Sequence, residues 1–447
     1  MAPKITVIGT GYLGATHAAA MAELGFEVLG VDIVPEKVEM LGEGRVPMYE
    51  PGLEDLLARH VQGLEGSTGR LHFTTSYEEA GAFGDIHFVC VNTPQKHGEY
   101  ACDMSYVDAA FESLAPRLTR PALVVGKSTV PVGSAARLAK RLAELAPVGE
   151  DAELAWNPEF LREGYAVQDT LHPDRIVAGV TSEHAEKLLR EVYAKPITEG
   201  SPFVVTDFPT AELVKTSANS FLSTKISFIN AMAEVCEAAD GDVVKLAEAI
   251  GYDDRIGRKY LRAGIGFGGG CLPKDIRAFM ARAGELGADQ ALTFLREVDS
   301  INMRSRARMV ELAREVLGGG SFLGRRVAVL GATFKPDSDD VRDSPALNVA
   351  GQIHLQGGQV TVYDPKGMDN ARRLFPTLGY AATALDAARG ADVVLHLTEW
   401  REFRDLDPAA LGEVVAEQRI LDGRNALDPD VWREAGWTYR ALGRPRA

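Results

Sequence analysis

The chain has 447 residues, 46% of them hydrophobic and 25% charged, which is typical of a soluble globular protein with more than one domain. Its formal net charge of -15 argues against nonspecific binding to nucleic acid or to an anionic membrane, and four scattered cysteines argue against a disulfide framework or a zinc site. Because the sequence has neither a signal-peptide pattern nor an apolar run of about 18 residues, we expect a cytoplasmic protein. Because the cysteines lack metal-type spacing, we expect no metal.

The stretch from residue 5 to Asp32 has the pattern of a dinucleotide-binding βαβ unit. A short apolar run leads into Gly9-Thr-Gly11-Tyr-Leu-Gly14, an Ala-rich helical stretch follows, and a second apolar run ends at Asp32. Such glycines allow a tight turn, close approach of a pyrophosphate, and packing of helix on strand. Asp32 would accept from both ribose hydroxyls and repel a 2′-phosphate, which favours NAD over NADP. The alternative is a purely structural glycine-rich turn.

Two further apolar runs are each followed by a threonine. Residues 86–91 precede Thr93, and residues 122–126 precede Thr129. Strand ends line the ligand crevice of a doubly wound sheet, so both hydroxyls are candidate contacts to a cofactor or a water. The pattern leaves open that each hydroxyl only caps the next helix.

Two pairs of polar residues are spaced four apart. Glu159 and Glu163 follow a predicted strand, and paired carboxylates can transfer protons or be solvated surface charge. Lys215 and Asn219 lie on a long predicted helix from 210 to about 240 and would project from one face. They could donate to an oxyanion in a cleft, or be a solvated lysine and a locally bonded asparagine.

A single thiol stands at the end of a glycine run, in Gly264-Ile-Gly-Phe-Gly-Gly-Gly-Cys271-Leu-Pro273-Lys-Asp275. Pro273 suits the first turn of a helix, so Cys271 would face unpaired N–H groups that favour a thiolate. Helical spacing would bring Asp275 onto the same face. The alternative is a buried, inert cysteine before an ordinary helix.

The sequence predicts an α/β protein with two Rossmann-like doubly wound lobes joined by a long central helix and a helical middle domain. A second α/β unit starts at residue 326 and lacks the glycine fingerprint. Its Lys335, Arg342 and Arg424 suit phosphate groups, unless each is a surface charge. We expect an NAD-binding domain at 1–207, a central helical domain at 208–318, and a C-terminal Rossmann-like domain at 319–447.

Taken in order, these motifs resemble the nucleotide-sugar 6-dehydrogenase family over nearly the whole chain, together with Asp422-Gly-Arg-Asn425. The resemblance implies NAD-dependent four-electron oxidation at C6 of a nucleotide-linked hexose, from alcohol to aldehyde to carboxylate. Cys271 would form a thiohemiacetal and then a thioester that water hydrolyses. UDP-glucose is the expected substrate; dTDP-glucose and GDP-mannose are alternatives, the latter because Leu272-Pro273 also resembles the GDP-mannose enzymes.

The resemblance also implies roles for individual residues. The catalytic set is Thr129, Glu159, Lys215, Asn219, Cys271 and Asp275. The cofactor contacts are Gly9, Gly11, Tyr12, Leu13, Gly14, Asp32, Lys37, Thr93, Thr129, Glu163, Lys274 and Arg342. The nucleotide-sugar contacts are Glu159, Phe160, Leu161, Arg162, Glu163, Lys215, Asn219, Arg255, Tyr260, Leu261, Gly264, Phe267, Gly268, Lys335 and Arg424. Arg255 would reach a neighbouring subunit, which implies a homodimer or a larger homo-oligomer.

Two rival functions remain at this stage. A two-electron hydroxyacid dehydrogenase shares the NAD fold and a long helix but needs no nucleophilic cysteine. A noncatalytic NAD or nucleotide-sugar binding protein would bind these ligands without producing NADH. The combination of Cys271, Lys215, Asn219 and Asp275 argues against both.

Overall fold

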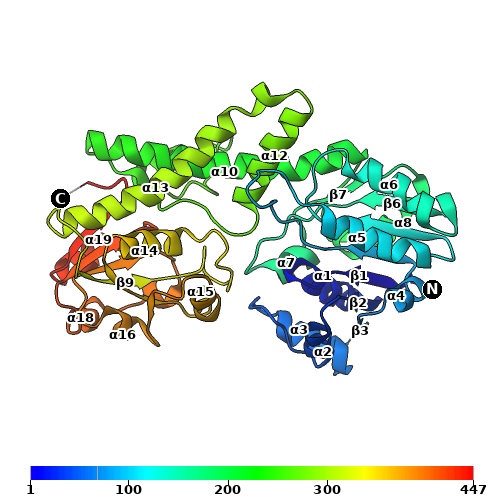
Figure 1. Cartoon of the computed structure of the whole chain (residues 1–447), viewed down its shortest axis with the longest axis horizontal. Helices are drawn as coiled ribbons and strands as arrows, with labels where there is room; N and C mark the ends of the chain where they lie inside the picture. The colour runs from blue at the N-terminus through cyan, green and yellow to red at the C-terminus, as the bar shows by residue number, and fades with distance from the viewer. Residues whose placement is uncertain (1, 68, 446–447) are drawn as a thin grey trace. The chain divides into compact units, whose positions relative to one another are not determined.

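The computed structural model describes residues 2–67 and 69–445. The chain falls into two compact units, one of Met1–Ala218 and Arg277–Leu286 and the other of Asn219–Ile276 and Gly287–Ala447. Each unit contains one largely parallel β-sheet covered by helices, as the ribbon in Figure 1 shows. We call them unit 1 and unit 2.

The sheet of unit 1 has eight strands among the described residues, in the order β3-β2-β1-β4-β5-β6-β7-β8. Every neighbouring pair is parallel except β6 and β7. The strands are β1 Ile5–Ile8, β2 Glu27–Val31, β3 Arg70–Thr74, β4 Ile86–Val89, β5 Ala122–Gly126, β6 Ala152–Trp156, β7 Ile176–Gly179 and β8 Phe203–Thr206. The helices of this part of the chain are α1 Tyr12–Glu23, α2 Pro35–Gly42, α3 Leu53–Gln62, α4 Tyr77–Phe83, α5 Ser105–Leu114, α6 Ser134–Leu145, α7 Ala166–Leu171, α8 Glu183–Val192 and α9 Ala194–Thr198.

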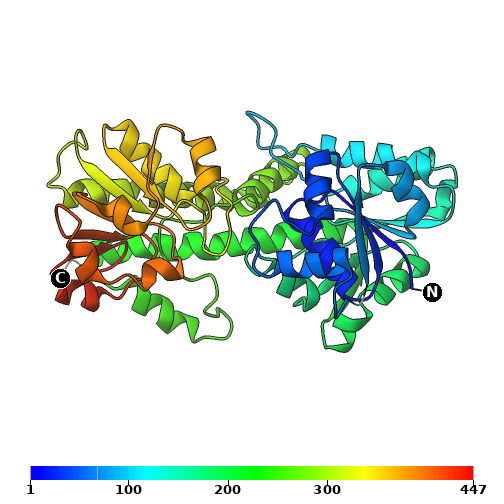
Figure 2. The ribbon, with the colours of Figure 1, turned by 90° about the horizontal axis from the view of Figure 1, so that it is seen from below.

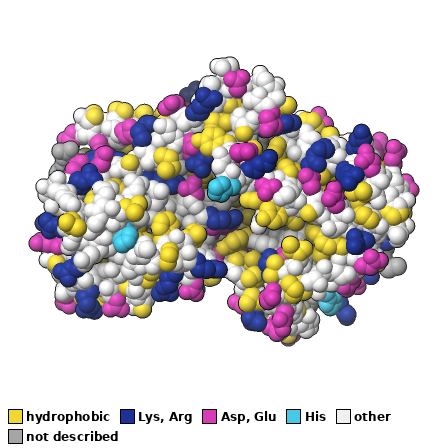
Figure 3. Space-filling view, viewed as in Figure 1, with side chains coloured by type: hydrophobic (Ala, Val, Ile, Leu, Met, Phe, Trp, Pro, Cys, Tyr) yellow, Lys and Arg dark blue, Asp and Glu magenta, His cyan; other side chains and the backbone are white. Residues whose placement is uncertain are grey.

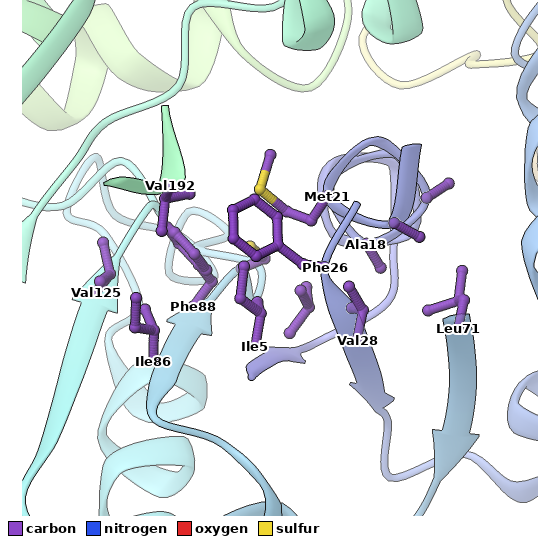
Figure 4. Close-up of a cluster of buried hydrophobic side chains, with 14 of the residues drawn as sticks. Ile5, Ala18, Met21, Phe26, Val28, Leu71, Ile86, Phe88, Val125 and Val192 are labelled. Carbon is purple, nitrogen blue, oxygen red and sulfur yellow. The ribbon is translucent and has the colours of Figure 1, made fainter. Parts of the chain in front are cut away.

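The core of unit 1 explains why the short apolar runs become central strands. β1, β4 and β5 are buried along their whole length, as expected of parallel strands covered on both faces. In Figure 4, Ile5, Val28 and Ile86 of the sheet lie in one apolar cluster with Ala18 and Met21 of α1. The alanines let α1 approach the sheet closely, and this fixes the helix that begins at the glycine turn.

The middle of the chain is helical. It comprises α10 Phe208–Ala239, α11 Val243–Gly251, α12 Leu272–Glu285 and α13 Phe294–Val316. Figure 2 shows α10 as one unbroken helix, consistent with a segment whose only Gly or Pro is Pro209 in its first turn. The predicted long helix is therefore present, beginning two residues earlier than expected.

The sheet of unit 2 has six strands among the described residues, all parallel, in the order β11-β10-β9-β12-β13-β14. The strands are β9 Arg326–Leu330, β10 Gln359–Tyr363, β11 Gly379–Tyr380, β12 Val393–His396, β13 Arg419–Asp422 and β14 Thr438–Ala441. The helices are α14 Pro345–Leu355, α15 Met368–Leu374, α16 Ala384–Ala388, α17 Arg401–Arg404, α18 Pro408–Gly412 and α19 Pro429–Glu434. The buried faces of α13 and α14 pack on this sheet in a second apolar core.

The predicted fold class, two Rossmann-like sheets with a central helical region, is confirmed. The division into units falls inside α10 and α12, so it follows packing and differs from the predicted boundaries at 207 and 318.

On the face shown in Figure 3, charged side chains of both signs lie among hydrophobic ones. Within the described residues, no helix combines the length and apolar character needed to span a membrane.

Candidate functional site

The glycine turn of unit 1 has the geometry of a dinucleotide cradle. Gly9 has a φ of +85°, which favours glycine, and a Cβ at Gly14 would lie 1.8 Å from the Gly9 carbonyl oxygen. Gly11 is the N-cap of α1, and no side chain caps this helix end. The N-terminal N–H groups and the positive end of the helix dipole are thus available to an anionic group such as a pyrophosphate.

Asp32 directly follows β2, and one of its two carboxylate oxygens accepts three hydrogen bonds within the protein. Oδ2 accepts from the backbone N–H and the hydroxyl of Thr10, both at 2.9 Å, and from Lys37 Nζ at 2.8 Å. Oδ1 accepts only one long bond among the contacts seen, from Val34 N–H at 3.2 Å. Burial opposes ionisation, but Lys37 and Thr10 outweigh it and hold the pKa of Asp32 below its usual value. An ionised Asp32 can therefore present Oδ1 to a ribose.

Thr93 and Thr129 follow β4 and β5 as predicted. The helices after them start elsewhere, because the N-cap of α5 is Met104 and that of α6 is Gly133. The alternative that these hydroxyls only cap the next helices is therefore excluded. Both residues lie at the carboxyl edge of the sheet, where α1 also begins.

Glu159 and Lys215 form an ion pair within unit 1, with Oε1 and Nζ 2.9 Å apart. The other carboxylate oxygen of Glu159 accepts from Leu161 N–H at 2.8 Å. The two side chains are 13% and 6% exposed, so Glu159 is not a solvated surface carboxylate and Lys215 is not a solvated lysine. Phe160 beside them stacks on the Arg175 guanidinium, 3.8 Å from the ring centroid.

The loop from Glu159 to Glu163 is held by a residue that the sequence did not reveal. Buried Glu50 accepts from the backbone N–H groups of Gly164 at 2.7 Å and Ala166 at 2.8 Å, across the start of α7. Arg162 in the same loop donates to the carboxylate of Asp169. No local spacing signals Glu50, because its partners lie more than 100 residues away, with a separation of 114 to Gly164.

Cys271 occupies the predicted position at a helix start. α12 begins at Leu272, and the Cys271 carbonyl accepts the first helical bond from Asp275 N–H at 2.9 Å, which makes Cys271 the N-cap. Pro273 lies in the first turn as expected. The thiol is exposed, whereas Cys90, Cys102 and Cys236 are buried, so the inert buried alternative is wrong for Cys271.

Asp275 lies one turn after Cys271 and is 2% exposed. Its Oδ2 accepts from Asn219 Nδ2 at 2.6 Å, and its Oδ1 accepts from Lys274 Nζ at 2.6 Å. Asn219 belongs to α10, one turn after Lys215. Asn219, Lys274 and Asp275 are thus joined by hydrogen bonds one helical turn after Cys271, and their association with the thiol stays a prediction.

The glycine run before Cys271 allows backbone and side chains of the C-terminal lobe to approach. A Cβ at Gly268 would lie 2.3 Å from the Asp343 carbonyl oxygen, and one at Gly270 would lie 2.3 Å from the Arg342 guanidinium carbon. Arg342 is in turn oriented by Asp340, whose carboxylate accepts from Nε and Nη2. Arg342 therefore lies against Gly270, next to Cys271 in the sequence, and its predicted contact to the cofactor stays a prediction.

Arg424 is engaged differently from expectation. Its guanidinium donates to the backbone carbonyls of Gly266 at 2.8 Å, Phe334 at 3.0 Å and Leu397 at 2.8 Å. It is a brace for the cysteine loop, and its assignment to a phosphate stays a prediction. Lys335 is half-buried, with Nζ 5.5 Å from the Phe334 ring centroid.

The segment before the cysteine loop, which is predicted to contact the nucleotide sugar, has two unusual residues. Tyr260 has a φ of +65°, an uncommon backbone conformation for a bulky side chain. The Arg255 side chain is 89% exposed and pairs with Asp253, with Nη2 and Oδ2 2.6 Å apart. Leu261, Gly264 and Phe267 are buried nearby in sequence.

Two residues of α13 that sequence reasoning missed clamp Phe267. Asn302 accepts from the Phe267 N–H at 2.7 Å and donates to its carbonyl at 3.0 Å. Arg306 donates to the same carbonyl at 2.9 Å and to the Asp343 carboxylate at 2.7 Å. Both are fully buried polar residues on a helix whose sequence looks like ordinary amphipathic packing, so only the fold reveals their role.

No group of three or more His, Cys, Asp and Glu in the described ranges could hold a metal.

Three family models match the chain in order. They describe the UDP-glucose/GDP-mannose dehydrogenase family: its NAD binding domain matches residues 3–197, its central domain 209–304 and its UDP binding domain 328–429. Cys271, Asp275, Lys215 and Asn219 fall in the second match. Arg342 and Lys335 fall in the third.

Individual relatives match end to end. A UDP-glucose 6-dehydrogenase of Rhizobium meliloti is 40% identical over 446 residues, 99% of this chain and 100% of that protein. A UDP-glucose 6-dehydrogenase of Bacillus subtilis is 38% identical over 99% of this chain and 98% of its own. Among solved structures, a UDP-glucose dehydrogenase of Pyrobaculum islandicum aligns with a TM-score of 0.90 and 37% identity, covering 99% of this chain and 98% of that one.

Proposed function

The chain belongs to the UDP-glucose/GDP-mannose dehydrogenase family, and from this premise we propose that it oxidises UDP-glucose at C6 to the glucuronate. It is an NAD-dependent nucleotide-sugar dehydrogenase. The observation that carries the proposal is the exposed Cys271 at the start of α12, with buried Asp275 one turn on and Asn219 bonded to it. A two-electron hydroxyacid dehydrogenase has no use for such a thiol.

The residues of unit 1 fit an NAD molecule. The uncapped N-terminus of α1 and its close glycines would hold the pyrophosphate, and Asp32 Oδ1 would accept from a ribose hydroxyl. Lys37 is already bonded to Asp32 and so would act through it. NAD, when bound, accepts a hydride in each oxidation. We assign the remaining predicted contacts, including Thr93, to the same ligand.

The chemistry at the sugar runs in four balanced steps. Loss of a hydride and a proton from the C6 alcohol gives the aldehyde. The Cys271 thiolate adds to the aldehyde carbon and forms a thiohemiacetal, which loses a second hydride to become a thioester. Water then adds to the acyl carbon, the C–S bond breaks with the Cys271 thiolate as the leaving group, and the carboxylate product and two protons are released. The helix N-terminus at Cys271 supplies the N–H groups that stabilise the thiolate.

The other proposed catalytic residues stabilise negative charge on the substrate or position the attacking water. Lys215 and Asn219 stabilise the oxygen that becomes negative during addition and hydrolysis. Asp275, an acceptor already oriented by Asn219 and Lys274, positions the attacking water, with Thr129 and Glu159 assisting. The Glu159–Glu163 loop, the Tyr260–Gly264 segment, and Phe267, Gly268 and Lys335 bind the nucleotide sugar in this proposal.

A panel of substrates tests the proposal. We expect NADH formation with UDP-glucose at a kcat/KM well above those for dTDP-glucose and GDP-mannose, because the relatives that match end to end are UDP-glucose enzymes. Initial rates with each sugar at saturating NAD give the ranking. A preference for GDP-mannose would move the chain to the other branch of the family, and binding without any NADH would make it noncatalytic.

We also propose a homodimer or a larger homo-oligomer. Phe221, Phe228 and Val235 are spaced seven apart on α10 and are 66%, 48% and 56% exposed, which is unusual for large apolar side chains on one helix. Arg255 is exposed as well and suits contact with another subunit.

A further inference from the structure

Lys127 is a buried lysine close to two of the proposed catalytic residues. It follows β5, two residues before Thr129, and is 6% exposed. Its Nζ donates to Asn157 Oδ1 at 3.0 Å and to the Tyr193 hydroxyl at 3.3 Å. Asn157 follows β6, two residues before Glu159. Lys127 thus links the two strand ends that carry Thr129 and Glu159.

The Asn157 side chain does not depend on Lys127 for its hydrogen bonds. Asn157 Oδ1 also accepts from the Tyr193 hydroxyl at 2.6 Å, and Asn157 Nδ2 donates to the Val177 carbonyl at 2.8 Å. Lys127 Nζ also donates to the Asn157 backbone carbonyl, but over 3.4 Å, so an uncharged side chain at 127 would remove one long bond to a buried acceptor and leave the Asn157 side chain satisfied. Burying an ammonium with only neutral hydrogen-bond partners costs stability, so the charge requires another explanation.

The charged and titratable groups that face Lys127 come from five other elements. They are His17 of α1, Cys90 after β4, Glu159 after β6, Tyr193 after α8, and Lys215 of α10. Burial, and then Lys127, lowers the pKa of His17 well below its ordinary value, and burial raises the pKa of Cys90 to about 12. These two groups are therefore neutral near pH 7. Burial likewise raises the pKa of Tyr193, which leaves Glu159 as the anion of the set.

Lys127 and Glu159 line one cavity of unit 1. His17, Asn157 and Tyr193 line it as well, beside Leu13, which follows the glycine turn. His17 Nε2 is buried without a hydrogen-bond partner among the described residues, so the polar wall of this cavity is not fully used by the protein itself. The cavity thus has both a buried cation and a carboxylate in its lining.

We propose that Lys127 is a positioning residue for the oxidation, which orients Glu159 and Thr129 through Asn157 and supplies a fixed positive charge near the Glu159–Lys215 pair. This inference rests on the proposed function. It implies that the lysine is retained for activity at a cost in stability.

Substitution by methionine separates the two effects. Lys127→Met keeps the length of the side chain and removes the charge, so kcat with UDP-glucose should fall by about tenfold or more while the unfolding temperature stays equal or rises. Lys140→Met on the exposed face of α6 is the matched control and should change neither quantity. A Lys127→Met protein that is less stable, or that fails to fold, and a folded variant with wild-type kcat would each overturn the proposal.

The pH profile provides a second readout. Burial lowers the pKa of Lys127 to about 8, with Cys90 and Glu159 opposing and Lys215 adding to the shift. The lysine is charged below this pH and loses its charge as pH rises through it. The kcat of the wild type should therefore decline as pH rises through about 8, and the pH profile of Lys127→Met should lack this decline. An identical decline in both proteins would contradict the proposal.

A double-mutant cycle identifies the residue through which Lys127 acts. In a Glu159→Gln background, Lys127→Met should change kcat much less than in the wild type, because the shared carboxylate is gone. Fully multiplicative effects would contradict the link. If the wild type fails to oxidise any nucleotide sugar, the proposed function fails first, whatever the variants do.

Discussion

At the scale of single residues, the proposed hydrolysis depends on Asp275. It is buried, bonded to Asn219 and Lys274, and one helical turn from the thiol. Asp275→Asn keeps the shape and an acceptor for Asn219 but removes the base, so Cys271 should still become acylated while turnover falls by roughly 10²- to 10⁴-fold. Intact-protein mass spectrometry after mixing with UDP-glucose and NAD should show an acyl adduct on the chain.

The matched control for that experiment is Asp289→Asn, at an exposed carboxylate after α12. It should turn over like the wild type and show no adduct. An Asp275→Asn protein that keeps wild-type turnover would remove Asp275 from the mechanism. An inactive variant with no adduct would place its role before the thioester.

Sequence reasoning worked at residues whose function depends on local geometry. Gly9, Gly14, Asp32 and Cys271 were predictable because a turn, a strand end or a helix start needs a particular residue within a few positions. Glu50, Asn302 and Lys127 were not, since each acts on backbone or side chains brought near only by the tertiary fold. The sequence around a buried polar residue of this kind has no periodicity that distinguishes it from a polar residue on the surface.

At the scale of elements, α10 has two different faces. Lys215 and Asn219 are buried, whereas Phe221, Phe228 and Val235 are exposed at seven-residue spacing. The helix is 32 residues long, and helices in proteins are stabilised more by packing of an apolar face than by intrinsic propensity. The exposed apolar positions are therefore expected to be covered by a second copy of the chain.

Charged substitutions on that stripe test the expectation. Phe221→Glu with Phe228→Glu should convert the protein to a monomer in sedimentation velocity at micromolar concentration, because burying two carboxylates at an interface is strongly unfavourable. Activity should fall with it if Arg255 reaches a neighbouring subunit. The control, Leu355→Glu at an 87% exposed position on α14, should leave the sedimentation coefficient unchanged. A wild type that is already monomeric would refute the oligomer outright.

The elements themselves were predicted more completely than their grouping. The apolar runs and the breaker-free stretch at α10 identify strands and helix directly, since these are local patterns. The division into units lies inside α10, after Ala218, and inside α12, after Ile276, so it depends on which apolar faces meet. The predicted domain boundaries at 207 and 318 stay predictions. The contacts of Arg424 to the backbone carbonyls of Gly266, Phe334 and Leu397 likewise depend on the fold, while its predicted contact to a phosphate stays a prediction.

In the whole molecule, both sheets contain the same pair of residues, a threonine that donates two hydrogen bonds to an aspartate. In unit 1, Thr10 donates its N–H and hydroxyl to Asp32, and in unit 2 Thr333 does the same to Asp364. Asp364 is 1% exposed and also accepts from the Trp400 indole at 3.1 Å. The sheet of unit 2 thus repeats the Rossmann topology. Its carboxylate at this position, Asp364, is buried and hydrogen-bonded within the protein, so it is not available to the ribose of a dinucleotide.

The number of NADH molecules formed per UDP-glucose consumed, with the sugar limiting and NAD in excess, distinguishes one oxidation at C6 from two. In the proposed mechanism one chain oxidises C6 twice, and Cys271 holds the substrate between the second oxidation and hydrolysis. We expect two NADH per sugar and a carboxylate product. One NADH per sugar with release of an aldehyde, or two with an undiminished rate in Cys271→Ser, would contradict the account.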